Sequence, residues 1–153
     1  MASAAALYAL TNAIQPVLRA WGQAANIALA DSGLAPPLAK ALLLAYRLGD
    51  GIQQSVLAEE IGVNPGALVR TLDQAEAAGL LQRREVPRNR RARAIYVLAE
   101  GRRIALHMEA ALEALRAELF AGLSESEVVS ATRVLRLLEQ GSIDYHQHAR
   151  TRK

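Results

Sequence analysis

Arginine side chains are crowded into one short stretch of this chain. Eight of them lie within residues 79–103 against only two glutamates, so the stretch carries +6 whereas the whole chain carries +3. Crowding of like charges costs self-repulsion, which neutralisation by phosphate relieves. We therefore favour contact with a polyanion over an ordinary solvated hairpin. The arginines are Arg83, Arg84, Arg88, Arg90, Arg91, Arg93, Arg102 and Arg103.

A helix predicted over residues 65–79 carries side chains of the kind that read DNA bases. Leu68, Leu72 and Ala75 recur at helical spacing and are expected to face inward. The outward side then consists of a row formed by Gly66, Arg70 and Gln74, flanked by Ala67 and Thr71.

Arg70 is the first candidate for reading sequence. An arginine donates two parallel hydrogen bonds to guanine and a glutamine pairs similarly with adenine, each worth roughly 1–3 kcal/mol of discrimination. Ala67 is small enough to pack on a thymine methyl group. For Gln74 and Thr71, a base contact and an ordinary solvated helix face are equally good interpretations.

Two further groups are placed to hold the DNA backbone. Gln53, Gln54 and Ser55 stand at the predicted start of a helix, where side chains and free amides bind phosphate; helix capping explains Ser55 equally well. Arg88, Arg90 and Arg91 lie at the tip of a predicted hairpin and suit the minor groove or its phosphates.

The elements that position these groups form a winged helix. A helix over 54–61, a turn at 62–64 and a helix from Pro65 make a helix-turn-helix, with Asn64 as N-cap and also a candidate DNA contact. Strand-like runs at 81–86 and 94–98 follow, separated by a basic tip at 87–93. This order of elements specifies a winged helix.

Most of the remaining chain is predicted to be helical. Apolar residues follow a helical stripe over 4–30, which Pro16 either kinks or divides in two, and Pro36 opens the next helix. A helix over 101–121 precedes a capping box at Ser124 and Glu127, which starts a last helix expected to end at Gly141. The fold class is thus mainly α with a small β-hairpin wing.

The segments LAEEIGVNP (57–65) and LDQAEAAGLL (72–81), the hairpin at 87–101 and the order of elements together resemble the MarR family of bacterial transcription regulators. The resemblance implies one domain over 1–145, with a winged-helix DNA-binding lobe at 36–99. Residues 1–35 and 100–145 would form a helical dimerisation region, and 146–153 a polar tail. It further implies a homodimer on a pseudo-palindromic operator, expected to act as a repressor.

The resemblance also implies release by a small aromatic or phenolic ligand bound between the two regions. Candidates to line such a pocket are Tyr8, Trp21, Tyr46, His107 and Met108, although each is more often a core or interface residue.

Two departures from the family pattern stand out. Asn89 replaces the aspartate of the usual Asp-Arg-Arg in the wing and lacks its charge. Gly66, Ala67 and Val69 stand where the family tends to present serine or threonine, which leaves fewer donors for base edges.

Several other function classes find no support in the sequence. The absence of cysteine excludes disulfides and thiolate metal sites. His146 and His148 are too poor a set for a metal, and Ser142, Asp144 and His146 lack the context of a hydrolase triad. We expect no enzyme, no cofactor and no metal.

The sequence also bears on where the chain resides. The longest apolar runs, such as 39–45, are too short to span a bilayer, and residues 1–10 lack the basic start of a secretory signal. A cytoplasmic chain without membrane contact is expected. The alternative to a DNA-binding regulator is a winged helix that contacts protein or RNA without specific duplex readout.

Overall fold

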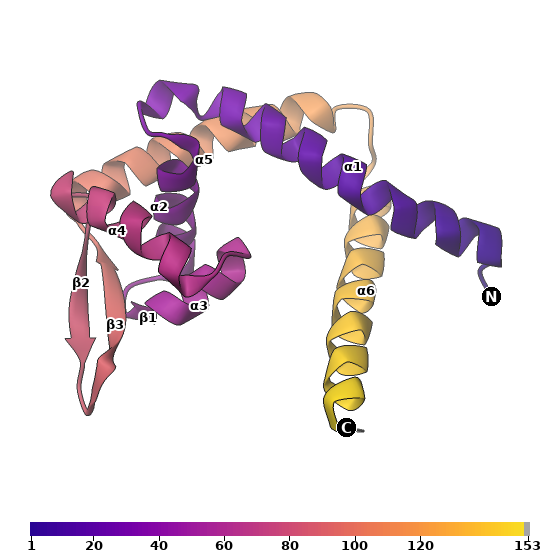
Figure 1. The fold of residues 1–153 in the computed structure, drawn as a ribbon. Coiled ribbons are helices and arrows are strands. Elements are labelled where there is room, and N and C mark those ends of the chain that lie inside the picture. Colours follow the sequence, from indigo (N-terminus) through magenta and orange to yellow (C-terminus); the bar gives the residue numbers. More distant parts are fainter. Residues whose placement is uncertain (152–153) are drawn as a thin grey trace. The chain divides into compact units, whose positions relative to one another are not determined.

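The computed structural model describes residues 1–151, apart from the side chain of Arg90, and divides into two units at Arg116 and Ala117. The elements, shown in Figure 1, are α1 (Ala4–Ala28), η1 (Ala30–Ser32), α2 (Pro36–Leu48), β1 (Ile52–Gln53), α3 (Gln54–Ile61), α4 (Pro65–Ala77), β2 (Leu81–Val86), β3 (Asn89–Val97), α5 (Ala99–Leu119) and α6 (Glu125–Thr151). The mainly helical winged-helix fold is confirmed.

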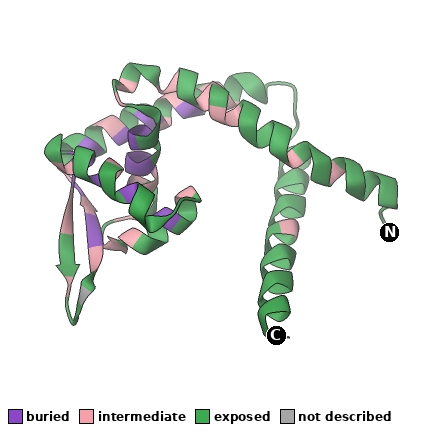
Figure 2. Cartoon of the chain, viewed as in Figure 1, coloured by how far each residue is buried: buried purple, intermediate pink, exposed green. Residues whose placement is uncertain are grey.

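Helix α1 is a single helix despite Pro16 in its interior. The Ser3 hydroxyl caps its start by accepting a hydrogen bond from the Ala6 amide at 3.2 Å. None of its residues is buried within the chain (Figure 2). The alternative of two helices separated at Pro16 is therefore wrong.

The helix-turn-helix has the predicted turn and helix starts, although α4 ends at Ala77, two residues before the predicted end at Gly79. Gly62 closes α3 in the left-handed conformation, with φ of 79°. The Asn64 side chain then accepts a hydrogen bond from the Gly66 amide at 2.8 Å, and Pro65 is the first residue of α4. Local cap and turn chemistry thus fixes both helices.

The core holds α4 against the rest of the first unit. Leu42 of α2, Leu57 of α3, Leu72 of α4 and Met108 of α5 are fully buried in one cluster. Burying each of these side chains contributes about 1.5–3 kcal/mol. The outward face of α4 is therefore held in a defined orientation by its inward one.

The sheet has three antiparallel strands in the order β1-β3-β2. Strand β1 was not predicted; it pairs Ile52 with Ile95 of β3. The base of the wing packs closely on α5, because Gly101 lies against the Leu80 carbonyl and a Cβ there would fall well inside contact distance.

The expected basic tip at 87–93 is wrong in its extent. Strand β3 begins at Asn89, so only Pro87 and Arg88 connect the two long strands. Pro87 suits the first central position of a tight turn, and Arg88 takes the left-handed conformation with φ of 67°. Arg90, Arg91 and Arg93 therefore belong to a strand.

In the second unit, the expected end of the last helix at Gly141 is also wrong. Helix α6 continues to Thr151 and includes most of the predicted polar tail. Side-chain pairs four residues apart, such as Gln140 with Asp144 at 2.8 Å, support it. The capping box is confirmed, since Ser124 Oγ accepts from the Glu127 amide and Glu127 Oε2 from the Ser124 amide.

Candidate nucleic-acid interface

The outward face of α4 presents one cation to solvent. Gly66, Arg70 and Gln74 are exposed, and Leu68 and Leu72 on the opposite side are buried. Among the described side chains, none forms a hydrogen bond or ion pair with Arg70. Its five N–H donors are thus available to a ligand outside the chain.

Ala67 and Thr71 flank the row of Arg70 on the side of α4 that borders a cavity. Both line a cavity in the first unit, and Thr71 is only partly exposed. Helical geometry explains this placement, because residues 67 and 71 are one turn apart and form their own row beside the row of Arg70.

Most arginines of the basic stretch are paired within the chain. Arg83 of β2 reaches back to α4, where its guanidinium bonds Asp73 and Glu76. Its Nε lies 2.9 Å from Glu76 Oε2, and its amide donates to Glu76 Oε1 at 2.6 Å. The side-chain hydrogen bond from Arg83 lowers the pKa of Glu76, and the same bond raises the pKa of Arg83.

Four more arginines of the stretch also have partners. Arg84 lies over the Tyr96 ring, 4.3 Å from its centroid. The others form ion pairs: Arg93 with Glu85, Arg102 with Asp50 and Arg103 with Glu100. The formal charge of the hairpin therefore overstates the cationic groups left for a polyanion.

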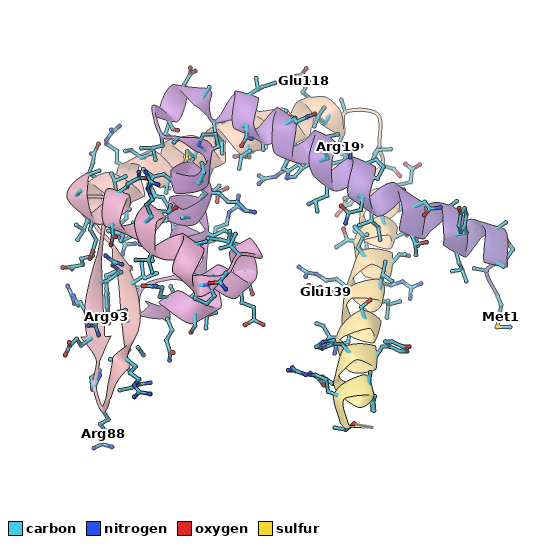
Figure 3. The ribbon with its side chains drawn as sticks, in the orientation of Figure 1. Met1, Arg19, Arg88, Arg93, Glu118 and Glu139 are labelled. Carbon is cyan, nitrogen blue, oxygen red and sulfur yellow. The ribbon has the colours of Figure 1, made fainter. Side chains whose placement is uncertain are left out.

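The tip keeps its cations exposed. Figure 3 shows Arg88 at the far end of the hairpin, directed away from the helices. Arg91 is exposed on β3, and the described side chains include no partner for either guanidinium. The predicted contact by the Arg90 side chain lies outside the described part. Asn89 Oδ1 accepts from the Arg91 amide at 3.2 Å, so the asparagine shapes the start of β3 without a charge.

A shallow depression of about 300 Å³ joins the wing to the start of α3. Its walls include Gln53, Gln54 and Ser55 on one side and Asn89 and Arg91 on the other. Free amides at a helix N-terminus and a guanidinium both favour an anion. The sequence identified these groups separately, and the antiparallel pairing of β1 with β3 brings them together.

A larger cavity of about 700 Å³ lies in the first unit among α1, α2, α3, α4 and residues 112–116 of α5. Trp21 lines it, whereas Met108 fills the core and Tyr8, Tyr46 and His107 are absent from its walls. His107 is exposed rather than on a buried face. Sequence reasoning missed the three cations of this cavity, Lys40, Arg47 and Arg116.

Two of these cations are held by one carboxylate. Glu109 of α5 accepts from Arg47 of α2 through both oxygens, at 2.5 and 2.9 Å, and lies 3.9 Å from Arg116. The hydrogen bond from Arg47 lowers the pKa of Glu109, and that bond raises the pKa of Arg47. Glu109 therefore stays ionised at neutral pH.

Within residues 1–151, no three histidine or carboxylate side chains are grouped as a metal site requires. No helix in the same part of the chain is long and apolar enough to cross a membrane.

Comparison with known proteins identifies similar chains. A sequence model of the MarR family matches residues 32–92. A MarR-family transcriptional regulator from Rhodococcus sp. RHA1 is 28% identical, with a TM-score of 0.70, over 84% of this chain and 94% of its own. CouR from Rhodococcus jostii RHA1, determined with bound p-coumaroyl-CoA, is 29% identical, with a TM-score of 0.69, over 80% and 87% of the two chains.

The fold likeness extends further. MarR from E. coli, in its apo form, has a TM-score of 0.70 over 84% of this chain and 95% of its own. Its 22% identity supports the fold alone.

Proposed function

The chain belongs to the MarR family of transcriptional regulators, and on that premise we propose that it binds double-stranded DNA as a homodimer and represses transcription from a pseudo-palindromic operator. Members of this family regulate transcription and are not enzymes. As a regulator of chromosomal genes, it would work in the cytoplasm.

The observation that carries DNA binding is the distribution of cations without internal partners. At the base of the wing the arginines are paired, while Arg70 on α4 and Arg88 and Arg91 on the wing are exposed. In a winged helix, the second helix of the helix-turn-helix reads the major groove. Arg70 then reads a guanine edge, and the wing binds the adjacent minor groove or its phosphates.

The remaining contacts fix the position of the protein on the duplex. The depression formed by Gln54, Ser55 and Arg91 is suited to one backbone phosphate. Gln74 lies farther along the exposed row of α4 than Arg70, Gly66 lets the backbone approach a base, and Asn64 contacts DNA beside its own cap. Ala67 and Thr71 contact the DNA from the adjacent row of α4, which also borders the cavity.

Exposed apolar side chains favour the homodimer. In the first unit α1 exposes Leu7, Tyr8, Val17, Leu18 and Ile27, and in the second α6 exposes Val129, Leu135, Leu137 and Tyr145. Large exposed apolar patches mark interaction surfaces. We assign residues 1–35 and the chain from 100 through the end of α6 to dimerisation, with 36–99 as the DNA-binding lobe.

The cavity supports control by a small aromatic or phenolic ligand. It has largely apolar walls that include Trp21, and Ala67, Leu68 and Thr71 of α4 form one of them. CouR binds p-coumaroyl-CoA, and by analogy we expect the cavity of this chain to take a ligand with an aromatic group. Occupation that favours another position of α4 would change the spacing of the two DNA-reading helices and release the operator.

Selection and footprinting test the proposal. The full chain would be incubated with fragments of its own upstream DNA, and bound fragments recovered and footprinted. We expect two protected half-sites about one helical turn apart, roughly 34 Å. Binding of bulk DNA or RNA without a preferred site would instead support the alternative, a winged helix without specific duplex readout. It would overturn the proposal of a sequence-specific regulator.

A further inference from the structure

Arg70 has an acidic neighbour one helical turn farther along α4. Asp73 lies three positions beyond it, and residues three apart on a helix are surface neighbours whose charged side chains can pair. Both residues are exposed, and the Asp73 side chain is 57% exposed. Among the described side chains, however, Asp73 forms its ion pair with Arg83 and none with Arg70.

Arg83 of β2 thus binds the carboxylate that Arg70 could have bound. Its Nη2 donates to Asp73 Oδ1, which is the one hydrogen bond of that carboxylate within residues 1–151. A second carboxylate holds Arg83 independently, because its Nε lies 2.9 Å from Glu76 Oε2 and its side chain is only 17% exposed. A guanidinium fixed in this way keeps the Asp73 carboxylate on the side of α4 that faces the wing.

The two carboxylates bound by Arg83 differ in what would restrain them without its guanidinium. Glu76 also accepts a hydrogen bond from the Arg83 amide at 2.6 Å, and a side-chain substitution leaves that donor in place. Glu76 lies six positions from Arg70, on another side of the helix. Asp73 has neither restraint, and Arg70 is the only lysine or arginine of α4. Loss of the guanidinium would therefore free Asp73 to pair with Arg70.

We propose that Arg83 determines DNA specificity through Asp73: by binding this carboxylate, it keeps the guanidinium of Arg70 free to read a base. This inference rests on the proposed DNA-binding function. It makes Arg83 a positioning residue, which acts on the base contact without touching the base itself.

The energetic argument concerns the complex with a wrong base. Specificity is the difference in affinity between the right and the wrong sequence. A free Asp73 would pair with Arg70 when no guanine faces it and would thus stabilise the wrong complex, whereas binding of guanine would break the pair. Because an exposed ion pair of this kind is weak, discrimination should fall by about two- to fivefold.

The first test measures base preference in matched double variants. The position read by Arg70 is the one at which Arg70→Ala relaxes the preference, and affinities for the operator and for a duplex changed at that position give the ratio. Arg83→Gln should lower this ratio about two- to fivefold. Adding Asp73→Asn to Arg83→Gln should restore it. Adding Glu76→Gln, which removes the same charge, should not.

A purely structural role of Arg83 predicts another pattern. A loosened wing would weaken binding to both duplexes alike and leave their ratio unchanged, and Asp73→Asn would then restore nothing. An unchanged ratio in Arg83→Gln, no restoration, or equal restoration by both double variants would overturn the proposal.

The second test needs no DNA. In ¹⁵N NMR spectra recorded at mildly acidic pH, the Nε–H signal of Arg70 is identified as the one lost in Arg70→Lys. Arg83→Gln should shift this signal, and the further change Asp73→Asn should return it to its position in the parent chain. An Arg70 signal that stays in place in Arg83→Gln would contradict the competition between Arg83 and Arg70 for Asp73.

Together the two tests separate this inference from the proposed function. A chain without any operator preference would overturn the regulator, and a reversible shift of the Arg70 signal would still sustain the competition for Asp73. Operator preference in the parent chain with an unmoved Arg70 signal would overturn this inference alone.

Discussion

Arg83 lies between two carboxylates of α4, Asp73 and Glu76, although it belongs to the first strand of the wing. The Arg83 side chain is only 17% exposed, so the pair is more sheltered than a surface ion pair. Because α4 and the wing enter different grooves in the proposed complex, this contact sets the angle between them.

Removing the ion pairs that Arg83 forms with α4 should loosen the attachment of the wing to that helix. Arg83→Gln is expected to lower the free energy of unfolding by about 1 kcal/mol, since a partly sheltered charged hydrogen-bond network is lost. Urea unfolding measures the change. Arg103→Gln breaks an equally bidentate but solvated pair with Glu100 and should leave stability unchanged. Equal effects of the two variants would show that the Arg83 ion pairs stabilise the chain no more than a solvated pair does.

Glu76 should also make stability depend on pH. The pKa of Glu76 in the folded chain is below its ordinary value of 4.5, so its contribution is complete above that value. It is lost as the pH falls through the lowered folded pKa. Urea unfolding at pH 7 and pH 3.5 measures this loss, and Glu76→Gln should lose less stability between these pH values than the parent chain. Glu118→Gln, at an exposed position, should match the parent.

Substitutions of Arg70 and Arg91 should change DNA binding in different ways. Arg70→Ala is expected to relax the preference at one base position of each half-site, at a cost of about 1–3 kcal/mol. Arg91→Ala should weaken binding to every sequence and lower the salt slope by about one. Competition titrations with single-base operator variants measure both. Arg19→Ala on α1 removes an equal charge as control; equal losses on all sequences for Arg70→Ala would contradict base reading.

Two substitutions at Arg88 distinguish the effect of its backbone conformation from the effect of its charge. Glycine favours the positive φ of this position, so Arg88→Gly should be more stable than Arg88→Ala by about 0.5–1 kcal/mol. Both variants lose the same guanidinium and should bind operator DNA with the same salt slope. Thermal unfolding tests the first expectation, and equal stabilities would show that the turn relaxes without cost.

Two glycine-to-alanine substitutions should change the stability of the chain in opposite directions. Gly101→Ala places a methyl against the Leu80 carbonyl and should lower stability by about 1–3 kcal/mol. Gly141→Ala, within α6 and with no atom near the added methyl, should raise it by about 0.5–1 kcal/mol. A neutral Gly101→Ala in calorimetric unfolding would refute the close packing of the wing base on α5.

Local chemistry explains which elements could be predicted. The boundaries of α3 and α4 depend on Gly62, Asn64 and Pro65, whose cap and turn preferences are visible in the sequence. Strand β1 consists of two residues that pair with Ile95 and Ala94, more than forty positions away, and no local signal marks it. Helix α6 passes Gly141 because the cost of one glycine, about 1 kcal/mol, is small against a long helix.

Some features of the candidate site follow from local sequence patterns, and others depend on tertiary packing. The exposed row containing Arg70 follows from helical periodicity, and the spacing of Lys40 and Arg47 could have suggested one face of α2. Their convergence with Arg116 of α5 depends on tertiary packing. Arg83 forms an ion pair with a residue of α4, and Arg102 with a residue of the loop before β1. Counting charges along the sequence therefore overestimated the number of wing cations available to DNA.

The most direct test of the central claim is the affinity for the recovered operator relative to a scrambled duplex of equal length and composition, followed by fluorescence anisotropy as salt is raised. A sequence-specific regulator should favour the operator by about 10³-fold or more at physiological salt, with the ratio persisting while both affinities fall. Equal affinity for the two duplexes at every salt concentration would contradict the account.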